Sequence, residues 1–103
     1  MAYKKQTPTD ERPALRVPPY SAEAEQAVLG AILLDAPRAM EICAEADVVP
    51  ESFWISANRT IFETASRLYG AGKPVDVVTV SEELRARGEL DTVGGVAALE
   101  RMV

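Results

Sequence analysis

The sequence has 103 residues, of which 48% are hydrophobic and 26% charged, and its formal net charge is −5. Histidine is absent and Cys43 is the only cysteine, which excludes a Ser-His-Asp or Cys-His nucleophile, a zinc site of Cys and His ligands and a disulfide within the chain. The longest apolar run, residues 27–34, is far shorter than a membrane span. We therefore expect one small, soluble domain of the cytoplasm.

Residues 1–20 differ from the rest in charge and in proline content. They carry a net charge of +2 and four of the seven prolines, whereas residues 21–103 carry −7. The apolar content of residues 1–20 is too low to offset the entropy lost on ordering, and these residues contain no apolar core of a signal peptide. We expect a disordered, proline-rich arm, and favour a solvated leader over a basic arm that contacts phosphates. The acidic remainder argues against direct binding of nucleic acid.

Helical periodicity begins at Ser21, a good N-cap, and Glu23 and Glu25 suit the first turn through the helix macrodipole. The apolar residues recur at spacings of three and four, which predicts an inward-facing stripe that comprises Ala24, Ala27, Val28, Ala31 and Ile32. Leu29 and Leu33 widen this stripe. Gly30 costs about 1 kcal/mol relative to Ala in the middle of a helix. We therefore expect another helix to approach closely at this position.

Asp35 is expected to end this helix and to cap the next, which has Pro37 in its first turn. The inner stripe of this second helix is predicted to comprise Ala36, Ala39, Met40 and Cys43. We interpret Cys43 as a small core residue rather than a reactive thiolate, because its charged neighbours are acidic. After a Val-Val-Pro break, Phe53 and Trp54 are expected to fill the core rather than form an aromatic binding platform.

A third helix is expected to begin with Ser56 as its cap. Its core face is predicted to comprise Asn58, Ile61, Phe62, Ala65, Leu68 and Tyr69. The opposite, solvated face carries residues four positions apart that can form ion pairs: Arg59, Glu63 and Arg67. Gly70 and Gly72 end this helix, and Pro74 prevents its continuation.

Residues 75–80 (VDVVTV) are the one segment where a strand is arguable, but their alternation is imperfect and residues 79–82 form a capping box. We expect an extended linker that leads into a helix over residues 80–87. Gly88 should end this helix, Leu84 should face inward, and Glu83 should pair with Arg87 on the outer side.

A last helix is expected to begin near Thr92 or Gly94. No glycine or proline follows it and the chain ends on two apolar residues, so we expect this helix to be truncated at the chain end. Its apolar side then needs a cover beyond residue 103, and its residues are candidate protein contacts: Val96, Leu99, Met102 and Val103.

Two motifs are weak matches to phosphate-binding loops. Residues 69–74 (YGAGKP) lack the features of a P-loop, because Arg67 stands where a glycine is needed and Pro74 where Ser or Thr is needed. Residues 93–96 (VGGV) are like the turn of helix-hairpin-helix DNA binders, but adjacent glycines favour an ordinary helix entry. The carboxylates form neither a calcium loop nor an acid/base pair, so we expect no catalytic, cofactor-binding or metal residue.

Residues 18–35 (PPYSAEAEQAVLGAILLD) resemble the opening signature of the N-terminal domain of the bacterial replicative DNA helicase family, DnaB. The resemblance covers about residues 17–103 and continues through Phe53, 59–62 (RTIF), 72–80 (GKPVDVVTV), Glu82, Leu84, Gly88, Leu90 and 93–95 (VGG). Ser52 and Trp54 stand where the family often has aspartate and tyrosine, and Asn58 where it tends to have histidine. We interpret these departures as local changes of packing or capping.

The resemblance implies an all-α fold, a small orthogonal bundle of about six helices over residues 21–103. It also implies a collar domain whose pairs assemble on a homohexameric ring around single-stranded DNA and bind primase. ATP and magnesium belong to a C-terminal motor domain of the parent helicase, so the resemblance carries no catalytic residue, cofactor or metal onto this segment.

Two functions from other classes stay open. A free-standing helical adaptor would share the bundle without a motor domain. A DNA-binding module would use the Gly94-Gly95 turn and the basic arm, and would bind DNA with a salt-sensitive affinity. An enzyme acting alone within 103 residues is the least favoured interpretation.

Overall fold

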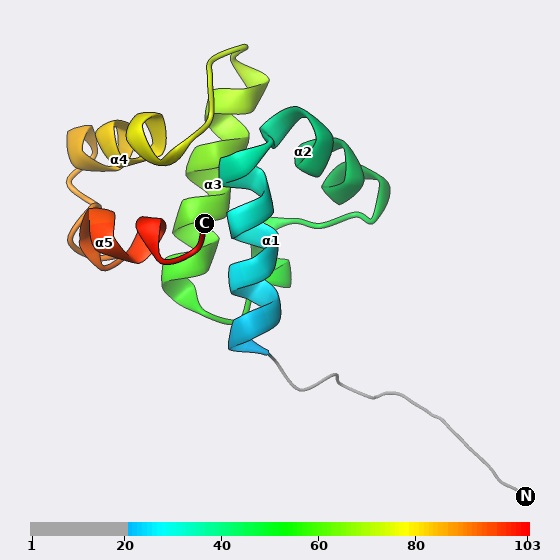
Figure 1. Ribbon diagram of the computed structural model, residues 1–103, viewed down its shortest axis with the longest axis horizontal. Helices are drawn as coiled ribbons and strands as arrows, with labels where there is room; N and C mark the ends of the chain where they lie inside the picture. The colour runs from blue at the N-terminus through cyan, green and yellow to red at the C-terminus, as the bar shows by residue number, and fades with distance from the viewer. Residues whose placement is uncertain (1–20) are drawn as a thin grey trace, which may run out of the picture.

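The computed structural model describes residues 21–103, so the predicted arm over residues 1–20 lies outside the described part. The elements in chain order are α1 (Ala22–Leu34), α2 (Ala36–Glu45), the 3-10 helix η2 (Pro50–Ser52), α3 (Ser56–Gly70), α4 (Val77–Ala86) and α5 (Gly95–Glu100) (Figure 1). Residues 21–103 contain no strand, which confirms the all-α fold; five α-helices and one 3-10 turn stand where about six helices were expected.

Helix α3 is the centre of the bundle. α1 packs along α3, and α2 contacts both of them, while α4 packs on α3 and α5 packs on α4 (Figure 1). The buried apolar side chains form one cluster between these helices. Its large, fully buried aliphatic members are Leu29, Ile32, Ile61, Val80, Leu84 and Leu99.

The start of α1 is as predicted, but its core face is rotated. The Ser21 hydroxyl oxygen accepts a hydrogen bond of 3.1 Å from the backbone N–H of Ala24, which confirms the N-cap. The buried residues are Glu25, Leu29, Gly30, Ile32 and Leu33, whereas the predicted Ala24, Ala27, Val28 and Ala31 are exposed. Apolar residues surround most of this helix, so spacing alone does not choose a face. Burial of leucine and isoleucine removes more apolar area from water than burial of alanine, and decides the orientation.

The second and third helices follow their predicted faces with two differences at the caps. The predicted inner stripe of α2 is buried or half-buried, with Cys43 in the core. Asp35 separates α1 from α2, but its side chain makes no capping hydrogen bond. Ser56 is the first residue of α3 rather than its cap, which is Ile55 and has no side-chain acceptor to offer. The predicted face of α3 is buried except for Tyr69, which is 40% exposed.

Helix α4 begins three residues earlier than predicted, so the expected extended linker into residues 80–87 is wrong. Asp76 is the N-cap: its carboxylate accepts from the Thr79 N–H at 2.8 Å, and the Thr79 hydroxyl oxygen accepts from the Asp76 N–H at 2.9 Å. This capping box forms one turn ahead of the predicted one. Val77 lies in the first turn of the helix. This capping box gives hydrogen-bond partners to backbone amides that would have none if residues 75–80 formed a strand.

The rest of α4 is as predicted. Leu84 is fully buried, and the Arg87 Nε donates to the Glu83 Oε2 at 3.0 Å on the outer side. Gly88 has a φ of +73° directly after the C-cap, the left-handed conformation that glycine adopts at low cost.

Helix α5 ends at Glu100 and is followed by a hydrogen-bonded turn, so the helix is shorter than expected. The Met102 N–H donates to the Leu99 carbonyl oxygen at 3.1 Å. In Figure 1 the end of the chain lies against α1. A Cβ added to Gly30 would collide with the carbonyl oxygen of Met102. The close approach predicted at Gly30 is therefore present, and the approaching element is this turn rather than a helix.

We expect Gly30→Ala to lower the free energy of unfolding by about 1–3 kcal/mol, because the Met102 backbone must move to admit a methyl group. Thermal and urea denaturation measure the change. Gly70→Ala is the matched control, since no atom lies within 4 Å of its added Cβ; it should be neutral or stabilising by up to about 1 kcal/mol. Equal effects of the two substitutions would contradict the close approach.

We expect Phe62→Ala and Leu84→Ala each to destabilise the domain by about 3–4 kcal/mol, because each deletes a large side chain from a core that cannot collapse fully. Phe62 is 3% exposed and Leu84 is fully buried. Urea denaturation measures both changes. An unaltered midpoint for Phe62→Ala would show that the inner face of α3 is misplaced.

Candidate functional site

The first feature of interest is a buried carboxylate that joins α1 to the entry of α3. Glu25 lies on the core side of α1 and is 9% exposed. Its Oε2 accepts from the Trp54 N–H at 2.7 Å, and its Oε1 accepts from the Asn58 Nδ2 at 2.8 Å and from the Ile55 N–H at 3.3 Å. This carboxylate therefore accepts from the backbone N–H groups of the two residues that precede α3 and from one side chain of its first turn.

Arg59 holds the same loop from its carbonyl side. Its Nε donates to the Phe53 carbonyl oxygen and its Nη2 to the Trp54 carbonyl oxygen, each at 2.9 Å. The predicted ion pair of Arg59 with Glu63 is therefore not formed, and residues 21–103 hold the single salt bridge on α4. Glu25 and Arg59 together satisfy both the N–H and the carbonyl oxygen of Trp54.

Burial raises the pKa of Glu25, but the hydrogen bonds from Asn58, Trp54 and Ile55 and the charge of Arg59 outweigh it. The pKa therefore lies below its ordinary value of 4.5. The carboxylate is ionised near neutral pH, where its acceptor role is needed.

The clamped loop decides the orientation of the two aromatic residues. Phe53 is 4% exposed and its ring centroid lies 5.0 Å from that of Phe62. Trp54 is 63% exposed, so the prediction that both fill the core is wrong for Trp54. Phe53 has extended backbone angles, and successive side chains of an extended backbone point to opposite sides.

Two of the three departures from the family pattern, Ser52 and Asn58, form local hydrogen bonds. Ser52 Oγ accepts from the Val49 N–H at 3.0 Å and closes the η2 turn. Asn58 binds the Glu25 carboxylate from within α3.

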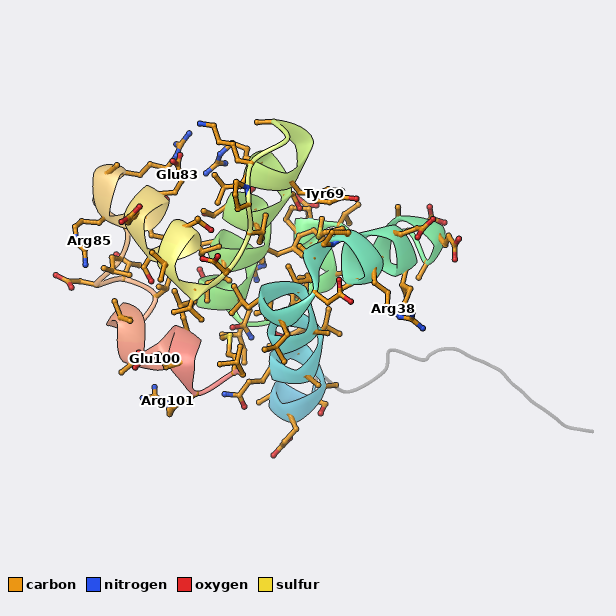
Figure 2. The ribbon with its side chains drawn as sticks, turned by 45° about the horizontal axis from the view of Figure 1, so that its top comes forward. Arg38, Tyr69, Glu83, Arg85, Glu100 and Arg101 are labelled. Atoms are coloured by element: carbon orange, nitrogen blue, oxygen red, sulfur yellow. The ribbon has the colours of Figure 1, made fainter. Side chains whose placement is uncertain are left out.

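The four candidate contact residues near the C-terminus separate by burial. Leu99 is fully buried in the core of the described residues, so it is not a surface contact and needs no cover beyond residue 103. Val96 and Met102 are half-buried, and Val103 is 51% exposed. In Figure 2 the neighbouring Glu100 and Arg101 lie at the same end of α5. Contact of the three accessible residues with another protein stays a prediction.

A second surface lies between α1 and α2, and we call it the α1–α2 groove. It has a volume of about 290 Å³ and apolar walls: Val28, Ala31, Ala39, Ile42, Cys43, Ala46 and Val48. Ile42 is 55% exposed, and Val28 is 37% exposed. Burial raises the pKa of the Cys43 thiol, in agreement with its predicted role as a core residue. The groove was not predicted, because its α1 wall is the stripe that periodicity assigned to the core.

The weak loop motifs are turns in the structure. Gly72, with a φ of +75°, follows α3, and its loop forms a shallow cleft of about 320 Å³ with the start of α2. Tyr69 lies at this end of α3, beside α2 (Figure 2). Gly94 and Gly95 have φ values of +103° and +76° and lead into the short α5, as an ordinary helix entry does.

Among residues 21–103, no group of three or more His, Cys, Asp or Glu side chains is placed to hold a metal ion. In that same part of the chain, no helix has the length and hydropathy needed to cross a membrane.

Sequence and fold are similar to those of known proteins. Residues 17–103 match the family model described as DnaB-like helicase N terminal domain. The chain is 46% identical over 87 residues to the replicative DNA helicase DnaB of Geobacillus stearothermophilus, which covers 84% of this chain and 19% of that protein. It is 42% identical over 84 residues to the replicative DNA helicase DnaC of Bacillus subtilis, and this match covers 82% of this chain and 18% of that protein.

The fold is similar to the crystal structure of the N-terminal domain of DnaB helicase from Mycobacterium tuberculosis. The TM-score is 0.78 at 37% sequence identity, and the match covers 84% of this chain and 60% of that chain. The chain spans about a fifth of the length of the curated relatives above. The resemblance inferred from residues 18–35 and the later motifs is confirmed.

Sequence reasoning missed the role of Glu25, which it assigned to the helix dipole. The available signal was its spacing: Glu25 lies four residues before Leu29 and eight before Leu33, on the face that proves to be buried. A carboxylate on an apolar face requires hydrogen-bond donors from another element. Those donors come from a loop 29 residues away in sequence, so spacing could not identify them.

We expect Glu25→Gln to lower the free energy of unfolding at neutral pH by about 2 kcal/mol, because the amide offers one acceptor and places an NH₂ group against an N–H donor. Because the pKa of Glu25 is lowered in the folded state, its contribution is complete above its ordinary pKa and is lost as the pH falls through the folded value. Stability measured from about pH 6 to pH 2 should therefore depend less on pH in the variant. Glu23→Gln, on the exposed side of the same turn, is the control; an equal loss in both variants would contradict the role of Glu25.

Proposed function

Since the chain belongs to the DnaB-like helicase N-terminal domain family, we propose that it is the non-catalytic N-terminal domain of a hexameric, ATP-dependent replicative DNA helicase of the cytoplasm. In this proposal the domain serves ring assembly, as dimer pairs within a homohexamer, and docks primase. ATP and magnesium bind to a motor domain of the parent chain, which also contacts the DNA.

The observation that carries the proposal is the difference in coverage. The match takes in 84% of this chain but 19% of the Geobacillus stearothermophilus helicase. The chain thus corresponds to one domain of a much larger relative, and that relative's printed name is replicative DNA helicase.

The charge of the domain supports protein partners over DNA for this segment. Residues 21–103 carry a net charge of −7, and phosphate neutralisation by basic residues supplies most of the affinity for nucleic acid. The apolar surface at the end of α5, formed by Val96, Met102 and Val103, is suited to contact with protein.

A free-standing adaptor is distinguished from a helicase domain by the intact mass of the native polypeptide. A chain several times heavier than 11.1 kDa that is retained on immobilised ATP would support the helicase. A native mass near 11.1 kDa would favour the adaptor instead.

We expect the domain to self-associate and to bind primase through the end of α5. Val103→Asp should then weaken one or both interactions about tenfold, or ~1.4 kcal/mol, because it places a charge in an apolar contact. Sedimentation velocity of the 103-residue chain, alone and with the primase of the same organism, measures this. Val78→Asp is the matched control, since Val78 is an exposed valine (62%) on α4. If the unsubstituted 103-residue chain stays monomeric and binds no primase, the assignment of both roles to this segment is refuted.

A further inference from the structure

Helix α1 is apolar on two sides, and the core uses only one of them. The buried side packs on α2, α3 and the turn after α5. The opposite side is exposed, and we call it the α1 outer face: Ala24, Ala27, Val28, Ala31 and Leu34. At the usual rotation of a helix these residues span about 120° of its circumference. An apolar stripe of that width is what a helix normally turns towards a core.

The α1–α2 groove widens this surface. Val28 and Ala31 belong to both the groove and the outer face, and Ile42 on the α2 wall is 55% exposed. Leu34, at the end of the face, is 72% exposed. A contiguous exposed apolar surface of this kind indicates a contact with another protein segment.

The outer face is complementary to a second copy of itself. We consider two α1 helices that run antiparallel, related by a two-fold axis at the level between Val28 and Ala31. Val28 of one copy is then level with Ala31 of the other, and Leu34 is level with the turn that holds Ala24. Each large side chain meets a small one, so the helix axes can approach to about 8–10 Å. A two-fold contact requires this kind of self-complementarity.

The charges at the two ends of the outer face favour the same arrangement. Glu23 lies one turn before Ala27 and is exposed at the start of the face. Arg38 is exposed in the first turn of α2, beyond the other end, and extends away from the body of the domain (Figure 2). In the antiparallel pair, Glu23 of each copy is level with the start of α2 in the other, near Arg38. A parallel pair would place the two Glu23 carboxylates together.

We propose that the α1 outer face is a contact between two copies of this chain, with their α1 helices antiparallel. The proposal rests on the self-association proposed above and adds a second surface to it. Dimer pairs within a hexamer require one contact within each pair and another between pairs. The end of α5 supplies one, and the α1 outer face supplies the other. The two surfaces are distinct, because the turn after α5 packs at Gly30 on the buried side of α1.

A charge at the centre of the face tests the contact. Ala31→Arg should raise the dissociation constant for self-association of the 103-residue chain more than tenfold, because it places a guanidinium group in the apolar contact of both copies. Sedimentation equilibrium over a range of concentrations measures the constant. Ala31 is exposed, so circular dichroism should show an unchanged fold and thermal midpoint. Ala86→Arg, at an exposed alanine on α4, is the matched control and should associate as the unsubstituted chain does.

Charge reversal tests the antiparallel arrangement. Glu23→Arg and Arg38→Glu each bring like charges together and should raise the dissociation constant a few-fold. Glu23→Arg/Arg38→Glu restores opposite charges and should return it to the unsubstituted value. General repulsion between acidic domains predicts the reverse for Glu23→Arg, because that substitution reduces the net negative charge.

The outcomes separate this proposal from the one it rests on. An unsubstituted chain that is monomeric at every concentration would refute both. If Val103→Asp weakens self-association but Ala31→Arg does not, the α1 contact alone is refuted. The same conclusion follows if Ala31→Arg weakens only the binding of primase, since the face then serves a different partner. Failure of the double reversal to restore association would overturn the antiparallel arrangement.

Discussion

The bundle depends on a carboxylate that is buried without a salt bridge. Glu25 crosses from α1 to the loop before α3, where it accepts from the backbone N–H groups of Trp54 and Ile55 and from the Asn58 amide of α3, while Arg59 holds the carbonyl oxygens of the same loop. Burial of a charge is costly unless hydrogen bonds replace its water. Here they do, and the result is a loop with one fixed path, which directs Phe53 into the core and Trp54 outward.

A second constraint closes the bundle at the other end of the sequence. The turn after α5 lies against Gly30, where any side chain would collide with the backbone of Met102. Glycine weakens a helix by about 1 kcal/mol relative to alanine, and at this position that cost permits close packing of the turn on α1. The turn after α5 is thus in close contact with α1, and Leu99 of α5 is fully buried in the core.

The described surface divides into regions of different character. The end of α5 presents Val96, Met102 and Val103, and the α1–α2 groove presents apolar walls. Both lie on a domain of the DnaB-like helicase N-terminal domain family, which spans 19% of the length of the Geobacillus stearothermophilus relative. The two regions lie in different parts of the bundle, one at the end of α5 and the other between α1 and α2.

The sequence by itself determined the helical class, the family, the faces of α2 and α3, and the glycine ends of α3 and α4, because these follow from local periodicity, caps and an ordered string of motifs. It also indicated that something approaches Gly30. Only the tertiary structure decided which face of α1 is buried, since apolar residues surround that helix and competition between large and small side chains settles the choice. Partners distant in the chain were likewise invisible to spacing: the donors of Glu25 come from another element, and Leu99 is covered by helices that precede it. The start of α4 at Asp76 follows from the reciprocal hydrogen bonds between Asp76 and Thr79, a capping box that lies ahead of the one expected over residues 79–82.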